Sequence, residues 1–431
     1  LFPIYIRRIL KINKKEASEK IVRIISFIKR VLINNTIRLL SIFIKKDYNL
    51  WLFSELGGNM FSGNLWYFYK YIKNNHKEIK TACFVNTEEL REKVSNQNNV
   101  AFPVNTIGSL MTVLKAGVCI FQDDMANDMV NYSRRDTLKI NLWHGGGIKK
   151  IFYSKKQSKH LITNKPIKKI IVDKVKNLLN YVRHEEYDFI AYKADIFKDI
   201  MIEAFNNKNV FLTGNARDDL FFKKIDRNYI LEKYQLQEIK NKKIITYVPT
   251  FRDNTKNDIN YNIFENNTKI LKMLNNQEVV ILQKKHPRRL LKYPIQNKIK
   301  NDQNIYILNK DIDTQELFYI TDIIITDYSG CYFDFLHTLR PIIFFPYDLK
   351  EYLIHDRELY FDYNDDLITP GPKVLNENDL YLAIKNFLIN PNLYLEERKK
   401  ALNHFQKYSD GNNSKRVYDS IQAILKQRQP S

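Results

Sequence analysis

One histidine and three glycines follow one another directly after a short apolar segment, in the run Leu142-Trp143-His144-Gly145-Gly146-Gly147. Consecutive glycines are unfavourable in a regular element, but they suit a loop whose backbone N–H groups approach an anion closely. A histidine at this place titrates near neutral pH and can accept a proton. The run therefore predicts an anion-binding loop with a proton acceptor beside it; a plain glycine turn next to a half-buried histidine is the alternative. It is neither a Walker motif nor a GxGxxG fingerprint, because the Lys-Ser/Thr pair and the glycine spacing are missing.

A second group of cationic side chains surrounds one proline in the run Lys284-Lys285-His286-Pro287-Arg288-Arg289. Ammonium, guanidinium and protonated imidazole groups stabilise a transferring phosphoryl group or a departing phosphate. We therefore expect this run to bind phosphate, and a solvated basic turn is the alternative.

The run from Ile325 to Asp334 joins the end of an apolar strand to the expected start of a helix near Ser329. Ser329 would be the N-cap, and the amides after it would offer an anion site that the helix dipole strengthens. Asp327 and Asp334 repel phosphate, so we expect them to accept hydrogen bonds from ligand hydroxyls or to orient a basic residue. Simple helix capping without a ligand is the alternative.

Two further segments place an arginine after a predicted strand. Arg252 follows Pro249 and Thr250, and Arg217 follows Thr213-Gly214-Asn215-Ala216. Arginine at a strand end is suited to phosphate, although an arginine beside an aspartate often forms only a surface pair. The sequence has no Cys/His metal cluster and no Gly-x-Ser-x-Gly elbow. Cationic groups at strand ends suit a small phosphate-rich ligand better than a nucleic-acid backbone, which favours a continuous basic face.

The elements that must position these residues follow from alternating patterns. Short apolar runs alternate with amphipathic stretches from residue 49 onward, which predicts βαβ units with parallel sheets. Two such blocks, near 49–222 and 240–390, indicate an α/β protein of two doubly wound domains joined by a linker at 223–242. Because parallel sheets bind ligands beyond the carboxyl ends of their strands, two facing domains would hold a central cleft. The predicted strands are Asn49–Phe53, Thr81–Val85, Val118–Phe121, Leu138–Trp143, Asp188–Ala191, Val210–Leu212, Ile244–Val248, Val279–Gln283, Ile305–Leu308, Ile323–Thr326 and Ile342–Phe345. The predicted helices are Leu65–Ile72, Ile107–Leu114, Val172–Leu179 and Phe197–Phe205, and helical pattern dominates after residue 377.

Length and composition agree with this organisation. The chain has 431 residues, of which 44% are hydrophobic, so it has ample material for two or three cores and is not a disordered or collagen-like protein. Lys and Arg number 69 against 48 Asp and Glu, which gives a formal charge of +21. Nucleic acid, anionic lipid and a polyanionic substrate are the candidate causes of this excess. Cys83, Cys119 and Cys331 lie far apart in apolar segments and are expected to be buried thiols in a reducing compartment.

The first part of the chain carries a basic amphipathic pattern. Apolar residues recur at helical spacing between Ile21 and Leu32, with lysines and arginines among them, and Asn34-Asn35 is expected to divide the segment into two helices. Such helices can lie among lipid headgroups, and ordinary packing helices are the alternative. No stretch has the roughly 20 apolar residues of a membrane-spanning helix. The chain begins at Leu1 rather than Met, so we expect a truncated or processed start.

Together these motifs resemble the CDP-glycerol glycerophosphotransferases, the teichoic acid polymerase family, over about residues 140–420. The central motifs, in family order, are Trp143-His144-Gly145, Thr213-Gly214 with Arg217-Asp218, Pro249-Thr250 with Arg252-Asp253, Lys285-His286-Pro287, and Thr326-Asp327-Tyr328-Ser329 with Phe333-Asp334. The later ones are Arg340-Pro341, Phe344-Phe345-Pro346-Tyr347-Asp348, Tyr360-Phe361-Asp362, Pro370-Gly371-Pro372 and Asp410-Gly411 with Ser414-Lys415-Arg416-Val417.

The resemblance implies a GT-B architecture, with the donor nucleotide in the C-terminal domain and the polymer approaching from the N-terminal side. It implies that His144 is the general base on the acceptor hydroxyl and that His286 stabilises the phosphoryl group or the leaving CMP. Gly146-Gly147 stands where relatives commonly have Thr-Pro, and Ser329-Gly330 replaces Ser-Ser, so the identity of the polyol stays open. The implied donor-binding residues are Gly145, Gly146, Arg217, Pro249, Thr250, Lys284, Lys285, Ser329, Gly330 and Asp334, and Arg252 and Asp327 are expected to support them.

We therefore expect a phosphotransferase of the EC 2.7.8 class that moves a polyol phosphate from a CDP-activated donor, CDP-glycerol first, to a hydroxyl of a membrane-linked, teichoic-type or capsular polymer. A CDP-ribitol ribitolphosphotransferase, a GT-B nucleotide-sugar glycosyltransferase and a noncatalytic basic module for nucleic acid or lipid are the alternatives. We expect no cofactor and no nucleic-acid partner, although Mg²⁺ held through substrate phosphates would leave little trace in a sequence. Residues 1–48 would be the membrane-associating segment, 49–225 the acceptor-side domain and 226–431 the donor domain. The expected location is the cytoplasmic face of the cell membrane, as a peripheral protein.

Overall fold

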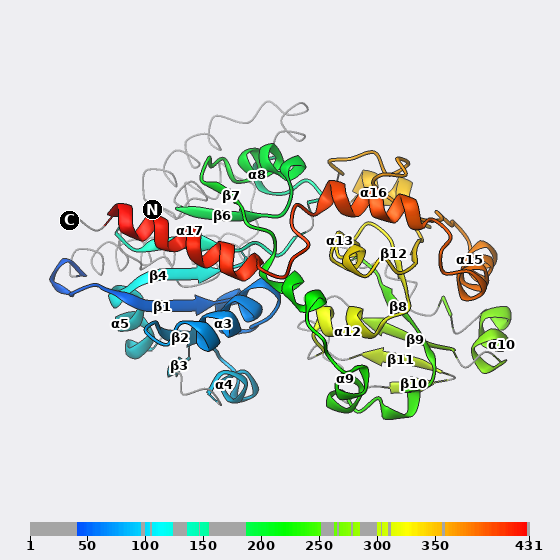
Figure 1. The fold of residues 1–431 in the computed structure, drawn as a ribbon, viewed down its shortest axis with the longest axis horizontal. Coiled ribbons are helices and arrows are strands. Elements are labelled where there is room, and N and C mark those ends of the chain that lie inside the picture. The colour runs from blue at the N-terminus through cyan, green and yellow to red at the C-terminus, as the bar shows by residue number, and fades with distance from the viewer. Residues whose placement is uncertain are drawn as a thin grey trace, which may run out of the picture. The chain divides into compact units, whose positions relative to one another are not determined.

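The computed structural model describes residues 41–95, 100–103, 106–123, 136–145, 147–154, 187–250, 263–264, 267–276, 279–284, 300–302, 304–308, 312–355 and 358–428. The chain divides into two compact units: residues 1–60, 78–139 and 163–186 in the first, and residues 61–77, 140–162 and 187–431 in the second. The strands form a seven-stranded sheet of order β3-β2-β1-β4-β5-β6-β7 and a six-stranded sheet of order β10-β11-β9-β8-β12-β13 (Figure 1).

Among its described residues the first unit has four parallel strands, β1 to β4, and their buried parts are mostly apolar. Every residue of β4 is buried, as is the second half of β1, which is what a parallel strand covered on both faces requires. The helix α5 begins with a capping box, in which Thr106 and Ser109 each bond the other's backbone N–H. The elements of this unit are η1 Ser41–Phe43, β1 Asp47–Ser54, η2 Leu56–Gly58, β2 Lys80–Phe84, α4 Glu88–Ser95, β3 Val100–Phe102, α5 Ile107–Lys115 and β4 Ala116–Phe121.

The strand β5, Leu138–Asn141, is parallel to β6, Phe189–Tyr192, which is parallel to β7, Val210–Leu212. The loop after β5 carries His144 and the glycines. Around these strands the second unit has α3 Gly63–Asn75, η6 Asp195–Phe197, α8 Lys198–Phe205 and η7 Ala216–Phe222.

The six-stranded sheet belongs to the second unit and is parallel except for β10, which pairs antiparallel with β11. Its strands are β8 Lys243–Val248, β9 Val279–Lys284, β10 Lys300–Asp302, β11 Ile305–Leu308, β12 Ile323–Thr326 and β13 Ile342–Phe344. The remaining helices of the second unit are α9 Arg227–Lys233, η8 Gln237–Ile239, α10 Thr268–Asn276, α12 Thr314–Ile320, α13 Tyr332–Phe335, η11 Leu336–Thr338, α14 Leu349–His355, α15 Glu377–Ile389, α16 Leu395–Phe405 and α17 Asn413–Arg428.

Both faces of this sheet are covered, and alternate residues of each strand divide between two apolar clusters. Ile245 and Ile281 pack on the side of α10 and α15, whereas Ile244 and Val280 pack on the side of α9 and α12 (Figure 1). Side chains of a strand point alternately to opposite faces, so continuous Ile and Val runs are required to fill both clusters.

The predicted strands are all present, most with ends that differ by one or two residues. Strand β5 ends at Asn141, two residues before the predicted end, because Trp143 adopts a left-handed backbone conformation with φ of 44°. The three-residue strands β3 and β10 were not predicted, and β10, which has the polar sequence Lys-Asn-Asp, corrects the expectation of wholly parallel sheets. The predicted helix Val172–Leu179 lies outside the described residues.

Two further expectations concern segments that the structure describes. The segment 223–242, predicted as a linker, contains α9 and η8, and its residues Ile230 and Ile239 are part of an apolar cluster of the second sheet. Cys83 and Cys119 are buried free thiols, as predicted, and Cys331 is a half-buried one. The domain boundaries at 48 and 225 remain predictions.

Candidate active site

His144 lies on the loop that follows β5, and its side chain is exposed. Its ring packs against the indole of Trp143, with ring centroids 4.4 Å apart. A Cβ atom at Gly145 would lie 2.8 Å from Nε1 of that indole, so only glycine lets the chain pass so close to it. Gly147 has φ of 73°, which also favours glycine. Gly145 and Gly147 therefore serve a tight loop, and the imidazole of His144 is exposed beside it.

Two buried side chains hold the carbonyl groups of this loop. The Nδ2 atom of Asn64 donates hydrogen bonds to the carbonyl oxygens of Leu142, at 3.1 Å, and Trp143, at 2.5 Å. The NH1 atom of Arg217 donates to the carbonyl oxygen of His144 at 2.9 Å. Asn64 and Arg217 are themselves joined, because the backbone N–H of Arg217 donates to Asn64 Oδ1 at 3.2 Å.

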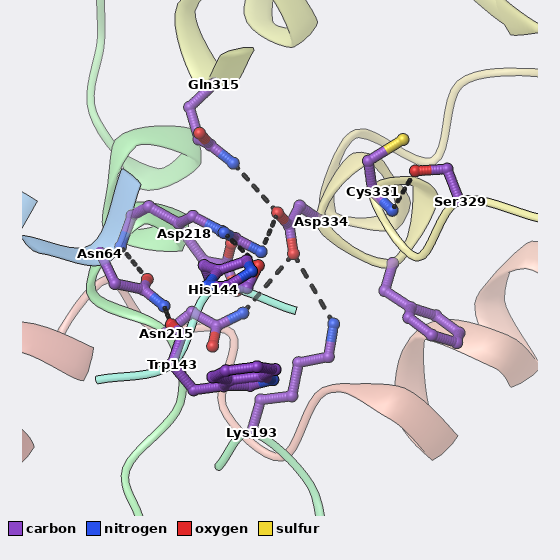
Figure 2. Close-up of polar contacts among 12 residues, drawn as sticks. Asn64, Trp143, His144, Lys193, Asn215, Asp218, Gln315, Ser329, Cys331 and Asp334 are labelled. Atoms are coloured by element: carbon purple, nitrogen blue, oxygen red, sulfur yellow. Dashed lines mark hydrogen bonds and ion pairs between the residues drawn. The ribbon is translucent and has the colours of Figure 1, made fainter. Parts of the chain in front are cut away.

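The carboxylate of Asp334, which is 2% exposed, binds the other end of Arg217. Arg217 NH2 lies 2.8 Å from Asp334 Oδ2, and Lys193 Nζ lies 3.6 Å from Oδ1 (Figure 2). Gln315 and Asn215 donate to the same carboxylate at 3.0 and 3.5 Å. This surrounds a buried anion with donors, as burial of a charge requires.

The pKa values in this group follow from burial and from the charges that oppose it. Burial raises the pKa of the Asp334 carboxyl, and the cations beside it offset part of that rise. Burial lowers the pKa of Lys193, while the same carboxylate acts in the opposite direction. Burial alone would lower the pKa of Arg217, but Asp334 raises it overall. Arg217 is therefore a permanent cation beside the loop of residues 142–145, the histidine loop.

A second group of predicted residues lies at the ends of β8 and β12. Both carboxylate oxygens of Asp327 accept the backbone N–H of Thr250, at 2.8 and 3.1 Å. Lys149, from the loop after the glycines, donates to Thr250 Oγ1 at 3.4 Å. Asp327 thus holds the turn at Pro249 and Thr250, and its supporting role in donor binding remains a prediction.

The prediction that Ser329 is a helix N-cap is wrong. The helix α13 has four residues, begins at Tyr332 and has Cys331 at its N-cap position, without a side-chain cap. Ser329 Oγ instead accepts the N–H of Cys331 at 3.4 Å, which forms a local turn. Ser329 and Gly330 are half-buried there, and a helix this short lends little dipole to an anion site.

Lys284 is buried at the end of β9, and its Nζ donates to the carbonyl oxygen of Ile312 at 2.5 Å. Gly146, Arg252, Lys285 and His286 lie outside the described residues. The expected convergence of His144 and His286 on one donor therefore remains a prediction, as do the donor contacts.

Four residues of the site were missed from the sequence: Asn64, Lys193, Asn215 and Gln315. Asn64 is 1% exposed on an otherwise apolar face of α3, and a lone amide among apolar helix positions was the available signal. Lys193 follows strand β6 directly, in the same strand-end position as the residues that were singled out. Asn215 lies inside a run already chosen for its arginine. Gln315 has no comparable signal.

No group of three or more His, Cys, Asp or Glu side chains in the part of the chain that the structure describes could hold a metal ion. None of the helices among the described ranges is both long and apolar enough to cross a membrane.

Comparison with known proteins extends this description. A family model described as CDP-Glycerol:Poly(glycerophosphate) glycerophosphotransferase matches residues 36–423. The teichoic acid glycerol-phosphate transferase of Staphylococcus aureus is 28% identical over 403 residues, which cover 90% of this chain and 96% of that protein. The teichoic acid poly(ribitol-phosphate) polymerase of Bacillus spizizenii is 29% identical over 254 residues, 55% of this chain and 38% of its own length.

Solved structures share the fold. The wall teichoic acid polymerase TagF matches with a TM-score of 0.73 and 21% identity, over 96% of this chain and 99% of that one. A TagF variant soaked with CDPG matches with a TM-score of 0.69 and 21% identity, over 95% and 98%. A UDP-N-acetylglucosamine 2-epimerase from Listeria monocytogenes matches with a TM-score of 0.53 and 12% identity, over 88% and 98%.

The two parallel sheets and these structural matches define an α/β protein with a GT-B-like fold, as the sequence predicted. Its histidine loop lies beside a buried arginine at the end of a parallel strand. The chain belongs to the CDP-glycerol:poly(glycerophosphate) glycerophosphotransferase family and is a phosphotransferase of the teichoic acid type.

Proposed function

We propose that this protein transfers glycerol phosphate from CDP-glycerol to a terminal hydroxyl of a teichoic-type polymer and releases CMP. The observation that carries the proposal is the exposed imidazole of His144. It lies on a loop whose backbone carbonyl groups accept hydrogen bonds from Asn64 and Arg217. The family model that matches residues 36–423 is described as a CDP-glycerol glycerophosphotransferase, which supports CDP-glycerol as the donor and phosphotransfer as the reaction.

In the proposed reaction, a nitrogen of His144 removes the proton of the acceptor hydroxyl. The resulting oxygen forms a bond to the glycerol-bearing phosphorus, and the bond from that phosphorus to the oxygen bridging it to CMP breaks. CMP leaves with the electron pair of that bond. His286 and Lys285 would stabilise the charge on the phosphoryl oxygens and the leaving phosphate.

Ribitol phosphate is the second candidate for the transferred group. The poly(ribitol-phosphate) polymerase of Bacillus spizizenii is 29% identical over 55% of this chain, against 28% over 90% for the glycerol-phosphate transferase of Staphylococcus aureus. Family membership disfavours the nucleotide-sugar glycosyltransferase and the noncatalytic module that the sequence alone had left open.

We also propose that the protein works as a peripheral protein at the cytoplasmic face of the cell membrane, where a lipid-linked acceptor would be reached. The net charge of +21 favours an anionic surface. Ile42 and Phe43, at the start of the described chain, are 68% and 88% exposed, as apolar residues that enter a headgroup layer would be.

One assay tests the reaction and the polyol together. The protein is incubated with CDP-glycerol and, in parallel, with CDP-ribitol, with a glycerol-phosphate-primed acceptor, and CMP release is measured. We expect faster CMP release with CDP-glycerol. A nucleoside diphosphate as product, or no CMP from either donor, would contradict the proposal.

The same assay tests the base. His144→Ala should lower the rate of CMP release by about 10²–10⁴-fold, the usual contribution of a general base, while the fold is kept because the side chain is exposed. His404→Ala, a change to a histidine on α16, is the matched control and should retain the wild-type rate. A wild-type rate in the His144 variant would overturn its role.

A further inference from the structure

Three consecutive backbone carbonyl groups of the histidine loop accept hydrogen bonds from side chains of other segments. These hydrogen bonds were not predicted from the sequence. The carbonyl oxygens of Leu142 and Trp143 both accept from Asn64, and that of His144 accepts from Arg217. Neither contact touches the imidazole itself. Figure 2 shows Asn64 and the loop residues on one side of Asp334, with Asn64 reaching the loop from a separate element, α3.

Both the amide nitrogen and the amide oxygen of the Asn64 side chain form hydrogen bonds. Its Nδ2 group has two N–H donors and two carbonyl acceptors, and its Oδ1 atom accepts the backbone N–H of Arg217 at 3.2 Å. The reverse amide orientation would place an oxygen against two carbonyl oxygens, so the partners define the orientation. The residue is 1% exposed, and water cannot replace these bonds without a rearrangement.

The loop needs such support because its backbone is strained. Trp143 has φ of 44°, in the left-handed region that a bulky residue rarely adopts. A bulky residue in this region is strained and persists only where its surroundings hold it. Asn141 Oδ1 also accepts the N–H of Trp143 at 2.8 Å. The bonds from Asn64 and Arg217 therefore fix the direction in which the next residue, His144, leaves the strand.

We propose that Asn64 is a positioning residue for His144, with Arg217 as its partner, and that it acts on catalysis only through the histidine loop. This inference rests on the proposed function, because it takes His144 to be the base. Asp334 completes the arrangement, since its carboxylate fixes the far side of the Arg217 guanidinium at 2.8 Å.

The test is a double-mutant cycle in the full chain, with CDP-glycerol as the donor and CMP release as the readout. Asn64→Ala should lower kcat by about 10–100-fold, because a displacement of about 1 Å in a catalytic group has effects of this size. The KM for CDP-glycerol should change by less than about threefold, since a lost positioning contact acts on the reacting geometry. In a His144→Ala background, Asn64→Ala should have no further effect.

Asn207→Ala is the matched control. Asn207 is also buried, donates to the carbonyl of Tyr187 at 2.9 Å and accepts the N–H of Asn209 at 2.8 Å, so these bonds are not with the carbonyl groups of the histidine loop. It should lower stability to unfolding in urea by an amount similar to Asn64→Ala, yet leave kcat per folded molecule unchanged. Asn64→Ser, which leaves room for a bridging water, should recover part of the rate and provides the same test if the alanine variant does not fold.

The outcomes separate the inference from the proposed function. An inactive His144→Ala together with a wild-type kcat for Asn64→Ala overturns the inference alone. An equal loss from Asn64→Ala in both backgrounds also overturns it, because the effect would then not pass through His144. A fully active His144→Ala variant contradicts the proposed function, and the inference with it.

Discussion

The buried charges around Asp334 show how single residues set the energetics of the site. One carboxylate that is 2% exposed neutralises Arg217 and, more distantly, Lys193. Removing one partner of a buried pair leaves the other as an uncompensated charge in a poorly solvated place. Asp334 therefore has a structural role beside the basic residue Arg217, whereas its role in donor binding remains a prediction.

The first prediction at this scale concerns that carboxylate. Asp334→Asn should lower the free energy of unfolding by about 3–5 kcal/mol, because Arg217 and Lys193 lose the stronger of the two buried carboxylates that act on them, the other being Asp218. The measurement is the urea unfolding midpoint at pH 7. Asp366→Asn is the control: this carboxylate pairs with Lys373 at 2.5 Å but is 80% exposed, so its loss should cost less than about 1 kcal/mol. Equal losses in the two variants would show that burial does not matter here.

A second prediction concerns Lys70, whose ammonium lies over the rings of Tyr67, at 4.2 Å, and Trp66, at 4.9 Å. Burial lowers the pKa of Lys70 from its ordinary 10.5 to about 8, although Asp313 and Glu316 act in the opposite direction. Between these two pH values the unfolded chain binds a proton that the folded protein has lost, so this group makes stability rise with pH there.

Lys70→Met removes that dependence. Relative to the wild type, the stability of the variant to unfolding should be increased most at pH 7, and this increase should shrink as the pH rises from about 8 toward 10.5. Urea unfolding midpoints of both proteins at pH 7.0 and 9.5 measure it, with Lys198→Met, a change to an exposed lysine at the start of α8, as the control. A stability difference that is the same at both pH values would contradict the assignment.

At the scale of elements, the sequence predicted what depends on local pattern. The apolar runs that became β8, β9 and β12 were identified because a parallel strand buried on both faces must be apolar throughout. Parallel sheets bind ligands beyond the carboxyl ends of their strands. Polar residues after the predicted strands were therefore the candidates, and the loop of His144 and the turn at Thr250 were selected in this way.

What could not be predicted depends on tertiary contacts. Strand β10 has a polar sequence and exists because β11 offers it a free edge. Ser329 is a residue type that favours an N-cap, but its Oγ accepts the N–H of Cys331 in a turn that precedes α13, so the cap position falls on Cys331. Asn64 is an ordinary helix residue until the fold places the carbonyls of a distant loop against it.

One prediction belongs to the helix α17, whose first turn is capped by a residue from far away in the sequence. The carboxylate of Asp219 accepts the backbone N–H groups of Asn413 and Ser414 at 2.8 and 2.9 Å. Asp219→Ala leaves both donors unsatisfied and should cost about 1–2 kcal/mol, the upper range for a cap. Amide hydrogen exchange should accelerate in the first turn of α17 and not in α15, which has its own cap at Asn376. Unchanged exchange in α17 would mean that the cap contributes nothing.

At the scale of the whole molecule, the net positive charge has two candidate partners, an anionic substrate and an anionic membrane surface. Arg217 and Lys193 are committed to a buried carboxylate, so they add nothing to a surface field. Many other lysines are exposed, including those at 198, 208, 240 and 385. A uniform excess of charge would attract any polyanion, whereas a local basic and apolar segment would select a membrane surface.

The last prediction distinguishes these two cases with vesicles. The full chain should sediment with vesicles of phosphatidylglycerol and phosphatidylcholine but not with phosphatidylcholine alone, and binding should weaken between 0.1 and 0.5 M salt as the Debye length falls from about 10 to about 4 Å. Glutamine at four basic positions of the first segment should weaken binding by more than about tenfold, since each basic residue near the surface contributes about 1 kcal/mol. Those positions are Lys20, Arg23, Lys29 and Arg30. A control that replaces the exposed Lys198, Lys208, Lys240 and Lys385 by glutamine loses the same net charge. If both variants lose binding equally, the attraction is a property of the overall charge, and the proposed role of the N-terminal segment is wrong.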